Sequence, residues 1–437
     1  MEVIHHGGKD TVTGSCHEIP LDIGHLLVDC GLLQGGEATQ SEQVVRFPYK
    51  HLIGIAITHA HIDHIGRLPW LIASGFNKPI YCTPATNKLI PLMLEDGLKL
   101  QLGLSALQRD KVLSFIKRLI RPIPFKQWYR LGTKTYLRFQ PAGHILGSAY
   151  LEVKLPNNKI VVFSGDLGQY DTPLLPDPIS PTRADYLYIE TTYGNKNHDP
   201  AEQRAMRLAG IINHALTDGG TILIPAFSVG RTQELLFDIE LLIHQHNIDA
   251  NIPIILDSPL AEKVTKTYRQ FKKLWGKEAK TRLDAHRHPL AFDQCITVSD
   301  HKQHSRLVNR LKVSAEPAIV VAASGMCEGG RIVNYLKALL PDERNDVIFA
   351  GYQAKNTLGR QIQSGAIEVD INGKKVEINA QVHTMSGYSA HAGQDDLMRF
   401  IKGIEPPPEE IHLIHGEDDA KHAFATLLRT QQYRVIE

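Results

Sequence analysis

Cysteine is scarce and scattered in this sequence. Only five cysteines occur among the 437 residues, and no two of them have the CxxC spacing. An odd number without paired spacing argues against a disulfide framework, so we expect a reducing environment and a cytoplasmic location. The five positions are Cys16, Cys30, Cys82, Cys295 and Cys327.

Long apolar runs and an excess of either charge are also absent. No stretch of 18 apolar residues occurs, so we predict no transmembrane helix and no membrane partner. The first ten residues, MEVIHHGGKD, lack the basic start and apolar stretch of a signal peptide. Because 48 Lys and Arg residues face 47 Asp and Glu residues, the formal net charge is only +1. Any binding of a polyanion must therefore come from a local groove.

The apolar pattern changes along the chain and predicts one domain interrupted by another. The first part combines short strands with one long helical pattern at residues 87–120. From residue 201, short apolar runs alternate with helical patterns, which is typical of βαβ units and a parallel sheet. After residue 377 short strands and turns return, and a helix is expected from about residue 420. The predicted strands are 25–30, 52–58, 136–139, 149–155, 159–164, 221–225, 253–256, 318–322 and 347–350.

A histidine-rich turn follows the apolar run at residues 52–58. It reads His59, His61, Asp63 and His64 within six residues. Neutral imidazoles and carboxylates are preferred ligands of zinc and similar ions. Since one ion cannot easily use all four side chains from so short a loop, two neighbouring metal ions are the natural interpretation. A polar surface turn with chance histidines is the alternative.

Three further candidate ligands each follow or join predicted strands. His144 lies in the glycine-flanked turn AGHILGS, Asp166 in FSGDLG and His415 in LIHGE. Each alone could be an ordinary capping or hydrogen-bonding residue at the end of a strand. Together with the first cluster they give seven ligands, enough for two sites with open positions for water.

These residues resemble the metallo-β-lactamase superfamily, whose signature is HxHxDH followed by separate His, Asp and His ligands. Asp29, in VDCG, matches the first motif of that family. The resemblance covers essentially the whole chain and implies an αβ/βα sandwich and metal-assisted hydrolysis by a hydroxide that two metal ions hold. Asp29 would orient a ligand. The implied sites share Asp166, and are completed by His59, His61 and His144 on one side and by Asp63, His64 and His415 on the other.

The inserted region resembles the β-CASP nucleases, which include the cleavage and polyadenylation endonuclease subunit and its bacterial and archaeal relatives. The matching segments are ETTYG at 190–194, PAFSVGRTQE at 225–234, ASGM at 323–326, GGR at 329–331, GYQ at 351–353 and TLGR at 357–360. The additional family motifs fall on Glu190, on His391 in Ser-Ala-His, and on His415. Because long DNA-repair members carry an apolar residue at the last position, His415 favours RNA.

The resemblance thus implies an α/β protein with a metallo-β-lactamase domain at residues 1–200 and 381–437 and an inserted β-CASP domain at 201–380. The implied activity is hydrolysis of single-stranded RNA, as an endonuclease or a 5′-exonuclease, with two Zn²⁺ ions and Mn²⁺ as a possible substitute. Whether the chain forms a homodimer is left open. The alternatives are a DNA nuclease of this fold, a hydrolase of small esters or thioesters, and an inactive RNA-binding relative.

His391 and Glu190 are the predicted acid–base pair. Cutting a phosphodiester requires protonation of a poor alkoxide leaving group, and a histidine held by a carboxylate can stay cationic for that purpose. Alternatively, His391 is an ordinary residue at the start of a helix that begins near Ala390, with Ser389 as its cap.

Glycine-rich turns after two predicted strands of the insert suit phosphate recognition, because amides at the start of a helix attract anions and arginine grips phosphate. A tight turn that needs glycine for its backbone angles is the alternative. The candidate phosphate contacts are Ser228, Arg231, Ser324, Gly325 and Arg331. Histidines without ligand spacing are expected at the surface, namely His5, His6, His51, His198, His301 and His304.

Overall fold

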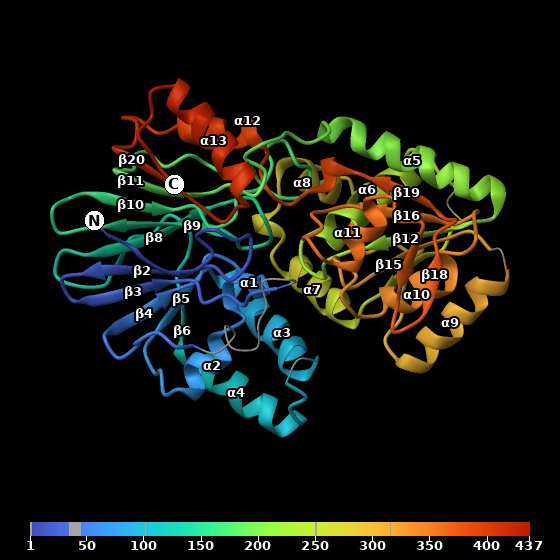
Figure 1. Ribbon diagram of the computed structural model, residues 1–437, viewed down its shortest axis with the longest axis horizontal. Coiled ribbons are helices and arrows are strands. Elements are labelled where there is room, and N and C mark those ends of the chain that lie inside the picture. The colour runs from blue at the N-terminus through green and yellow to red at the C-terminus, as the bar shows by residue number, and fades with distance from the viewer. Residues whose placement is uncertain (1, 35–44, 101, 250, 315) are drawn as a thin grey trace. The chain divides into compact units, whose positions relative to one another are not determined.

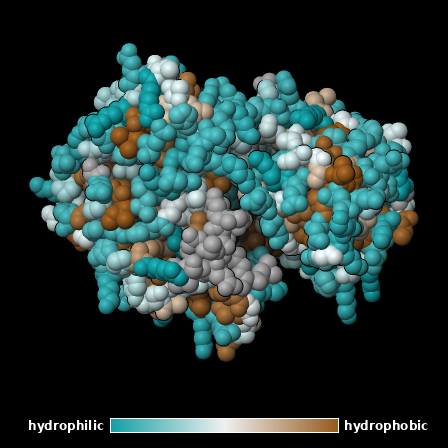
Figure 2. All heavy atoms as spheres, in the orientation of Figure 1, coloured by the Kyte–Doolittle hydropathy of each residue, from teal (hydrophilic) through white to brown (hydrophobic). Residues whose placement is uncertain are grey.

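The computed structural model describes all residues except 1, 35–44, 101, 250 and 315. Two compact units emerge: unit 1 comprises residues 1–197 and 391–437, and unit 2 comprises residues 198–390. Within the described ranges, none of the helices combines the length and the apolar composition needed to cross a membrane. On the face drawn in Figure 2, each unit is mainly hydrophilic, and hydrophobic atoms form small separate groups.

Unit 1 contains two β-sheets. The first has the order β1-β2-β3-β4-β5-β6 and the second the order β21-β20-β11-β10-β9-β8-β7. The first sheet consists of β1 (Ile4–Gly7), β2 (Cys16–Leu21), β3 (Gly24–Val28), β4 (Leu52–Ala56), β5 (Ile80–Cys82) and β6 (Ile120–Pro122). The second consists of β7 (Tyr129–Arg130), β8 (Tyr136–Pro141), β9 (Ala149–Lys154), β10 (Ile160–Phe163), β11 (Tyr186–Glu190), β20 (Glu410–Ile414) and β21 (Val435–Ile436).

Helices lie beside both sheets of unit 1 and complete a four-layer sandwich (Figure 1). Helices α2 to α4 lie beside the first sheet, and α12 and α13 lie beside the second. Strands β11 and β20 are parallel neighbours although more than two hundred residues separate them, so the C-terminal segment completes the second sheet. The helices are α1 (Ile62–Ile65), α2 (Leu68–Ala73), α3 (Pro84–Leu100), α4 (Ala106–Leu119), α12 (Gln394–Lys402) and α13 (Asp418–Thr430).

Among the described residues, apolar clusters hold the second sheet against the first sheet and against α12 and α13. Between the sheets, Leu26 packs in one cluster with Leu151 and Phe163, and all three side chains are almost fully buried. Under α12 and α13, Phe400 and Phe424 pack with residues of the second sheet. Full burial of a side chain of this size stabilises the fold by about 1.5–3 kcal/mol. The apolar face of each strand is therefore the face that packs against the neighbouring layer.

Unit 2 is built on a parallel sheet with the strand order β14-β13-β15-β12-β16-β19, as the alternation of apolar runs and helical patterns predicts. Predicted strand 221–225 coincides with β12, and those at 253–256, 318–322 and 347–350 agree with observed strands to within a residue. The strands are β12 (Thr221–Pro225), β13 (Ile254–Asp257), β14 (Cys295–Thr297), β15 (Ala318–Ala322), β16 (Asp346–Phe349), β17 (Glu368–Asp370), β18 (Lys375–Glu377) and β19 (Gln381–Thr384).

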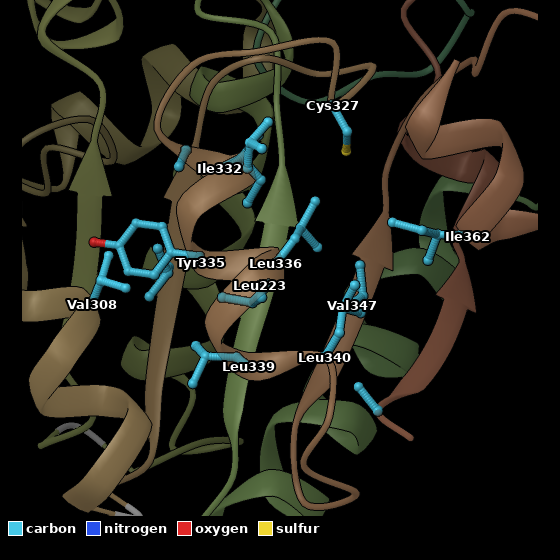
Figure 3. Packing of buried hydrophobic residues seen from close by; sticks show 14 of the residues in the cluster. Leu223, Val308, Cys327, Ile332, Tyr335, Leu336, Leu339, Leu340, Val347 and Ile362 are labelled. Atoms are coloured by element: carbon cyan, nitrogen blue, oxygen red, sulfur yellow. The ribbon is translucent and has the colours of Figure 1, made fainter. Parts of the chain in front are cut away.

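Helices of unit 2 pack on this sheet through an apolar core. Figure 3 shows Leu336 and Leu339 of α10 beside Leu223 of β12 and Val347 of β16. These strands are buried along their whole length, which explains why they appear in the sequence as continuous apolar runs. The α-helices are α5 (Ala201–Asp218), α6 (Arg231–His244), α7 (Pro259–Gln270), α8 (Lys277–Asp284), α9 (His301–Ser314), α10 (Ile332–Leu339) and α11 (Leu358–Gln363).

Two details differ from the sequence pattern. The single helix expected at 87–120 is two helices, because Ser105 caps a new helix, α4, by accepting a hydrogen bond from the backbone N–H of Gln108. Residues 381–384 form β19, which pairs with β16 in unit 2, and the chain leaves that unit only after Ala390.

Candidate metal centre

The histidine-rich turn follows β4 directly. The strand ends at Ala56, and α1 begins at Ile62, so His59 and His61 lie in the turn. Their ring nitrogens Nε2 and Nδ1 are 3.1 Å apart. Asp63 and His64 lie in the short helix. The change from extended chain to helix therefore sends the two pairs of side chains in different directions.

The other three predicted ligands come from loops at strand ends of the second sheet. His144 lies between β8 and β9, Asp166 lies just after β10, and His415 directly follows β20. In the turn before β9, the hydroxyl of Ser148 accepts hydrogen bonds from the backbone N–H groups of His144 and Ile145. The backbone N–H of His415 donates to the carbonyl of Gly8 at 2.8 Å. These bonds hold the ligand loops against rigid strands.

Gly165, beside Asp166, is required by close packing. Its φ of +52° is in the left-handed region, and a Cβ there would lie 2.7 Å from the Cβ of Thr58. A larger residue would therefore push the loop that carries Asp166 away from the loop that follows β4.

Asp166 lies at the centre of the cluster, and its two carboxylate oxygens face different histidines. Oδ2 is 3.4 Å from Nε2 of His59 and 3.5 Å from Nε2 of His144. Oδ1 is 3.2 Å from Nε2 of His64 and 3.6 Å from Nε2 of His415. The sequence motifs thus converge into two groups of potential ligands: His59, His61, His144 and Asp166, and Asp63, His64, Asp166 and His415.

The chemistry of these donors fits divalent metal ions. Nε2 of His64, Nε2 of His415 and both carboxylate oxygens of Asp166 are buried and have no hydrogen-bond partner among the described residues. Leaving so many polar atoms unsatisfied is costly unless cations occupy the space between them. Close pairs of potential ligand atoms within the two groups are 3.0–3.8 Å apart, around the ~3.3 Å edge of a tetrahedral zinc site with bonds of ~2.0 Å.

Burial and neighbouring charges together set the protonation states of the candidate ligands. Burial holds the pKa of His59 well below its ordinary value, so the ring is neutral and can donate a lone pair. Burial alone would raise the pKa of Asp166, but the surrounding histidines, His415 and His64 foremost, hold it well below its ordinary range. The group thus combines the neutral imidazole of His59 with the ionised carboxylate of Asp166. At His64, by contrast, the neighbouring carboxylates Asp166, Asp29 and Asp63 outweigh burial and hold the pKa well above its ordinary value.

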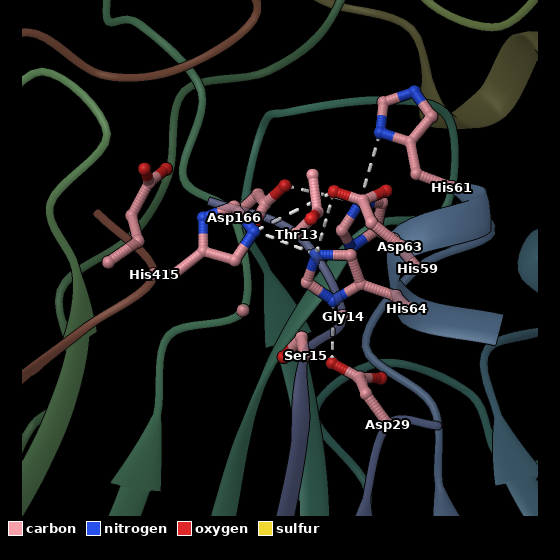
Figure 4. A network of polar contacts seen from close by, with 12 residues as sticks. Thr13, Gly14, Ser15, Asp29, His59, His61, Asp63, His64, Asp166 and His415 are labelled. Carbon is pink, nitrogen blue, oxygen red and sulfur yellow. Dashed lines mark hydrogen bonds and ion pairs between the residues drawn. The ribbon is translucent and has the colours of Figure 1, made fainter. Parts of the chain in front are cut away.

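Asp29 orients His64 from behind. Its Oδ2 lies 2.8 Å from Nδ1 of His64, so Nε2 of the same ring points towards Asp166 (Figure 4). The backbone N–H and the hydroxyl of Thr58 both donate to Asp29, each at 2.8 Å. Thr192 has a similar place beside His415, with its hydroxyl 3.2 Å from Nδ1. Sequence reasoning gave neither threonine a role, although Thr58 directly precedes the histidine-rich turn and Thr192 lies within the ETTYG segment.

Glu190 and His391 lie together, although they are 201 positions apart. Both carboxylate oxygens of Glu190, at the end of β11, are 3.1 Å from Nδ1 of His391. Nε2 of His391 is 3.9 Å from Oδ2 of Asp166. Burial alone would lower the pKa of His391, but the charges of Glu190 and Asp166 outweigh that effect and raise the pKa to about 9. The backbone N–H of Leu167 also donates to Glu190, at 2.7 Å, and fixes that carboxylate.

The alternative interpretation of His391 is wrong in its structural premise. Helix α12 begins at Gln394, with Gly393 as its cap, and no helix begins at Ala390. His391 lies in the loop before the helix, and its side chain is 18% exposed. A role as an ordinary residue in the first turn of a helix is therefore excluded.

Comparisons with known proteins agree with this arrangement. Residues 22–211 match the model of the metallo-beta-lactamase superfamily, residues 232–362 match the Beta-Casp domain, and residues 375–436 match the Zn-dependent metallo-hydrolase RNA specificity domain. Ribonuclease TTHA0252 of Thermus thermophilus is 36% identical, over 100% of this chain and 97% of its own length. The chain belongs to the β-CASP family of metallo-β-lactamase-fold hydrolases. The predicted fold class is confirmed.

Two further relatives of this β-CASP chain are named transcription termination factor FttA. Transcription termination factor FttA of Methanocaldococcus jannaschii is 32% identical, over 97% of this chain and 68% of its own length. FttA of Thermococcus kodakarensis is 34% identical, over 94% of this chain and 66% of its own length. A crystal structure of a protein of unknown function from Enterococcus faecalis V583 has a TM-score of 0.52 at 13% identity, over 95% of this chain and 93% of its own, which shows the fold alone.

In the β-CASP unit, the candidate phosphate contacts lie in turns that follow neighbouring parallel strands. Pro225 at the end of β12 pairs with Ala322 at the end of β15, so both turns lie at one edge of the sheet. They lead into α6 and α10, as predicted. A Cβ at Gly325 would lie 2.6 Å from the ring of Phe227, so packing alone already requires glycine there.

The polar side chains of these turns differ in their partners. The hydroxyl of Ser228 lies 3.1 Å from that of Ser258. The hydroxyl of Ser324 is buried without a hydrogen-bond partner among the described residues. Arg331 donates to Asp257 and to the carbonyls of Val298 and Ser299. Arg231, the first residue of α6, is buried.

One of the histidines expected at the surface of the β-CASP unit is buried. His304 is only 1% exposed, and its Nδ1 lies 2.7 Å from a carboxylate oxygen of Asp257, which is also buried. The helical pattern of α9 places this ring on the face that packs against the sheet. Spacing alone could not reveal this partner, because Asp257 is on a distant strand.

Proposed function

We propose that this chain is a metal-dependent ribonuclease that hydrolyses phosphodiester bonds of single-stranded RNA with two Zn²⁺ ions. The observation that carries the proposal is the position of Asp166, whose two carboxylate oxygens face separate groups of histidines. Two cations can therefore share one carboxylate between them.

In this proposal the seven predicted residues would hold the ions, and Asp166 would serve both of them. Zinc pairs of this kind supply a nucleophile at neutral pH and neutralise charge on the phosphate oxygens. Mn²⁺ can take the same nitrogen and oxygen donors. One ion would be held by His59, His61, His144 and Asp166, and the other by Asp63, His64, Asp166 and His415.

His391 acts as the proton donor to the leaving oxygen. Glu190 binds Nδ1 of the ring through both carboxylate oxygens, so Nε2 is the atom that faces the candidate metal centre. A carboxylate in this position favours the cationic ring and keeps it aimed. The alkoxide that leaves a phosphodiester is a poor leaving group. Transfer of the proton from Nε2 of His391 to the leaving oxygen removes that barrier.

Asp29 contributes indirectly, by holding the ring of His64. With Nδ1 of His64 committed to Asp29, Nε2 is the nitrogen left to bind a cation. Thr58 in turn holds Asp29 through two hydrogen bonds, so the orientation of the ring depends on all three residues.

The turns of the β-CASP unit are proposed to bind phosphate groups of the RNA. Ser228 and Arg231 precede and open α6, and Ser324 and Gly325 follow the neighbouring strand β15. Amides at the start of α6 and the hydroxyl of Ser324 suit an anion. Arg331 is the weakest of the candidates, since a phosphate would compete there with Asp257 and two backbone carbonyls.

RNA is favoured over DNA and over small esters by the kind of relatives the chain has. Its C-terminal segment, which contains His415, matches a model described as an RNA specificity domain. A relative that it matches over nearly the full length of both chains is named a ribonuclease. A small-ester hydrolase would leave the β-CASP unit and the Glu190–His391 pair without a role.

The test is incubation of the purified, metal-analysed protein with end-labelled single-stranded RNA and with DNA of the same sequence. We expect RNA to be cut in a zinc- or manganese-dependent reaction and DNA to stay intact. Internal fragments would identify an endonuclease, and progressive 5′ shortening an exonuclease. Faster cleavage of DNA than of RNA would contradict the proposal, and gel filtration of the active fraction would decide between monomer and homodimer.

A further inference from the structure

We propose that Glu18, His25 and His51 form an additional divalent-metal site in unit 1, separate from the candidate metal centre. Their potential ligand atoms all lie within 4.8 Å of one another. None of the three belongs to the seven residues proposed as catalytic ligands. The proposal therefore does not depend on the proposed function.

We call these three residues together with His6 the Glu18 cluster. The cluster is centred on the carboxylate of Glu18. Oε1 of Glu18 is the shared partner of Nδ1 of His25 and of Nε2 of His51, the latter at 2.7 Å. Oε2 accepts a hydrogen bond from Nε2 of His6 at 2.8 Å. One carboxylate thus has an imidazole pair on one oxygen and a single imidazole on the other.

The fold brings these residues together from four segments. Glu18 is on β2, His6 is on the adjacent strand β1, and His25 is on β3 at the other side. His51 lies one residue before β4, the next strand of the sheet. Chance proximity of flexible surface groups would not place three imidazoles, from two neighbouring strands and the residue before a third, around a single carboxylate.

The side chain of Glu18 is only 2% exposed, whereas those of His25 and His51 are 30% and 37% exposed. The ion pairs of Glu18 within the described part of the chain are all with histidines. A buried carboxylate usually requires a fixed cation beside it. A divalent cation on Oε1 would supply a permanent positive charge at that place.

The donor set matches that of zinc sites with an open position. Two imidazole nitrogens and one carboxylate oxygen leave a fourth, solvent-facing position for water. His6 would remain on Oε2 and hold the carboxylate in place, as hydrogen-bonded neighbours of metal ligands commonly do. The pKa of Glu18 supports an ionised carboxylate: burial raises it, but the bonds with His6, His51 and His25 lower it below its ordinary value.

Entry of an ion requires a small outward movement of the rings. The 2.7 Å between Nε2 of His51 and Oε1 of Glu18 is a hydrogen-bond distance, shorter than the ~3.3 Å edge expected for zinc bonds of ~2.0 Å. His25 and His51 can retreat by that amount because both rings are partly exposed. Three coordinate bonds, from Glu18, His25 and His51, would then replace the two hydrogen bonds on Oε1, and the protons on the two ring nitrogens would leave to water or to the other nitrogen of each ring.

An ion at this place would fasten the edge of the first sheet. It would tie β2 and β3 to the turn before β4, and His6 would extend the link to β1. Strand β1 ends at Gly7, and the carbonyl of the next residue, Gly8, accepts a hydrogen bond from the backbone N–H of His415. The site is therefore structural, and it braces the segment that supports one proposed catalytic ligand.

The test counts zinc ions on the full-length protein. Metal-free wild type is loaded with excess Zn²⁺, desalted and analysed for zinc, alongside Glu18→Gln and the double variant His25→Gln/His51→Gln. We expect both variants to retain one ion fewer than wild type. A matched control is His422→Gln, a histidine of unit 1 with a 77% exposed side chain outside the cluster, which should keep the wild-type count.

Counting zinc ions on the Asp166→Ala variant separates this site from the candidate metal centre. We expect that variant to keep the ion at the Glu18 cluster and to lose it when Glu18→Gln is added. Equal zinc counts in wild type and in the His25/His51 double variant would overturn the proposal and leave a hydrogen-bonded imidazole cluster. Because these two rings are partly exposed, the double variant answers the question even if Glu18→Gln fails to fold.

Discussion

Unit 1 contains two clusters of histidines around a carboxylate, and they differ in spacing and in burial. Around Asp166 the nitrogen–oxygen separations are 3.2–3.6 Å for four histidines, whereas around Glu18 they are 2.8 Å or less. The oxygens of Asp166 lack hydrogen-bond partners within the described residues, but those of Glu18 are satisfied by imidazoles. One cluster is thus arranged with space for cations, and the other is closed by hydrogen bonds until an ion displaces them.

The difference follows from how the fold holds each cluster. The histidines around Asp166 are backed by further partners, such as Asp29 behind His64 and Thr192 beside His415, so they cannot collapse onto the carboxylate. His25 and His51 lie at the rim of a sheet with part of each ring exposed. Rigid support keeps a binding site open, whereas exposed rings move to satisfy the nearest charge.

The largest expected effect is on the cluster around Asp166. We predict that Asp166→Ala remains folded but abolishes cleavage, because among the described residues Asp166 alone belongs to both groups of ligands. Losing one interaction of this kind often costs ~10²-fold or more in rate. Single-turnover rates with saturating RNA and zinc would measure the loss, with circular dichroism as the check on folding. Wild-type turnover in the folded variant would mean that the bridging ligand is elsewhere.

His391→Ala tests whether the same cluster includes a proton donor. We expect both ions and RNA binding to be retained, while the rate falls by about 10²–10⁴-fold, the usual contribution of acid catalysis. The defect should shrink on a nitrophenyl phosphodiester, whose leaving group needs no proton. Glu190→Gln should give the same pattern more weakly.

An equal loss on the RNA and on the nitrophenyl substrate would point to a positioning role for His391. If His391→Ala instead loses a metal ion, the ring is a ligand, and the assignment of His415 has to be revised. Zinc analysis of the same preparation distinguishes these two outcomes.

The support behind the ligands is tested by Asp29→Asn. Loss of the charge behind His64 should weaken zinc binding by about 10–100-fold, the usual effect of changing a partner that orients a ligand. Competition with a chelator of known affinity would measure it. Thr58→Ser is the matched control, since it keeps the hydroxyl that donates to Asp29, and it should bind zinc as wild type does.

The smallest effect on activity is expected from the second cluster. Glu18→Gln should cleave RNA within about twofold of wild type, because no proposed catalytic ligand contacts Glu18. When a chelator has removed the metal, the free energy of unfolding of Glu18→Gln should nevertheless be lower than that of wild type by roughly 1–2 kcal/mol. The reason is that the hydrogen bonds from the histidines lose their charged acceptor. Thermal unfolding of metal-free protein measures this change. A large loss of activity at unchanged stability would show that the two clusters are coupled.

The sequence by itself determined the strands and the candidate ligands next to their ends. Continuous apolar runs such as 221–225 marked the buried parallel strands, because a strand covered on both faces needs apolar side chains throughout. The density of histidine and aspartate after β4 marked a metal site for a similar reason: few other functions require those side chains at that spacing. Local chemistry of this kind is written in neighbouring residues.

The tertiary structure decided which distant residues meet. Glu190 and His391 become partners only because β11 joins the sheet and α12 returns over it, and spacing across 201 positions contains no such information. The same holds for Thr58 behind Asp29 and for the histidines around Glu18, of which His6 and His51 were expected at the surface and His25 at the start of a strand. Strand order in a sheet is set by long-range packing of apolar faces, and polar side chains receive their partners as a consequence of it.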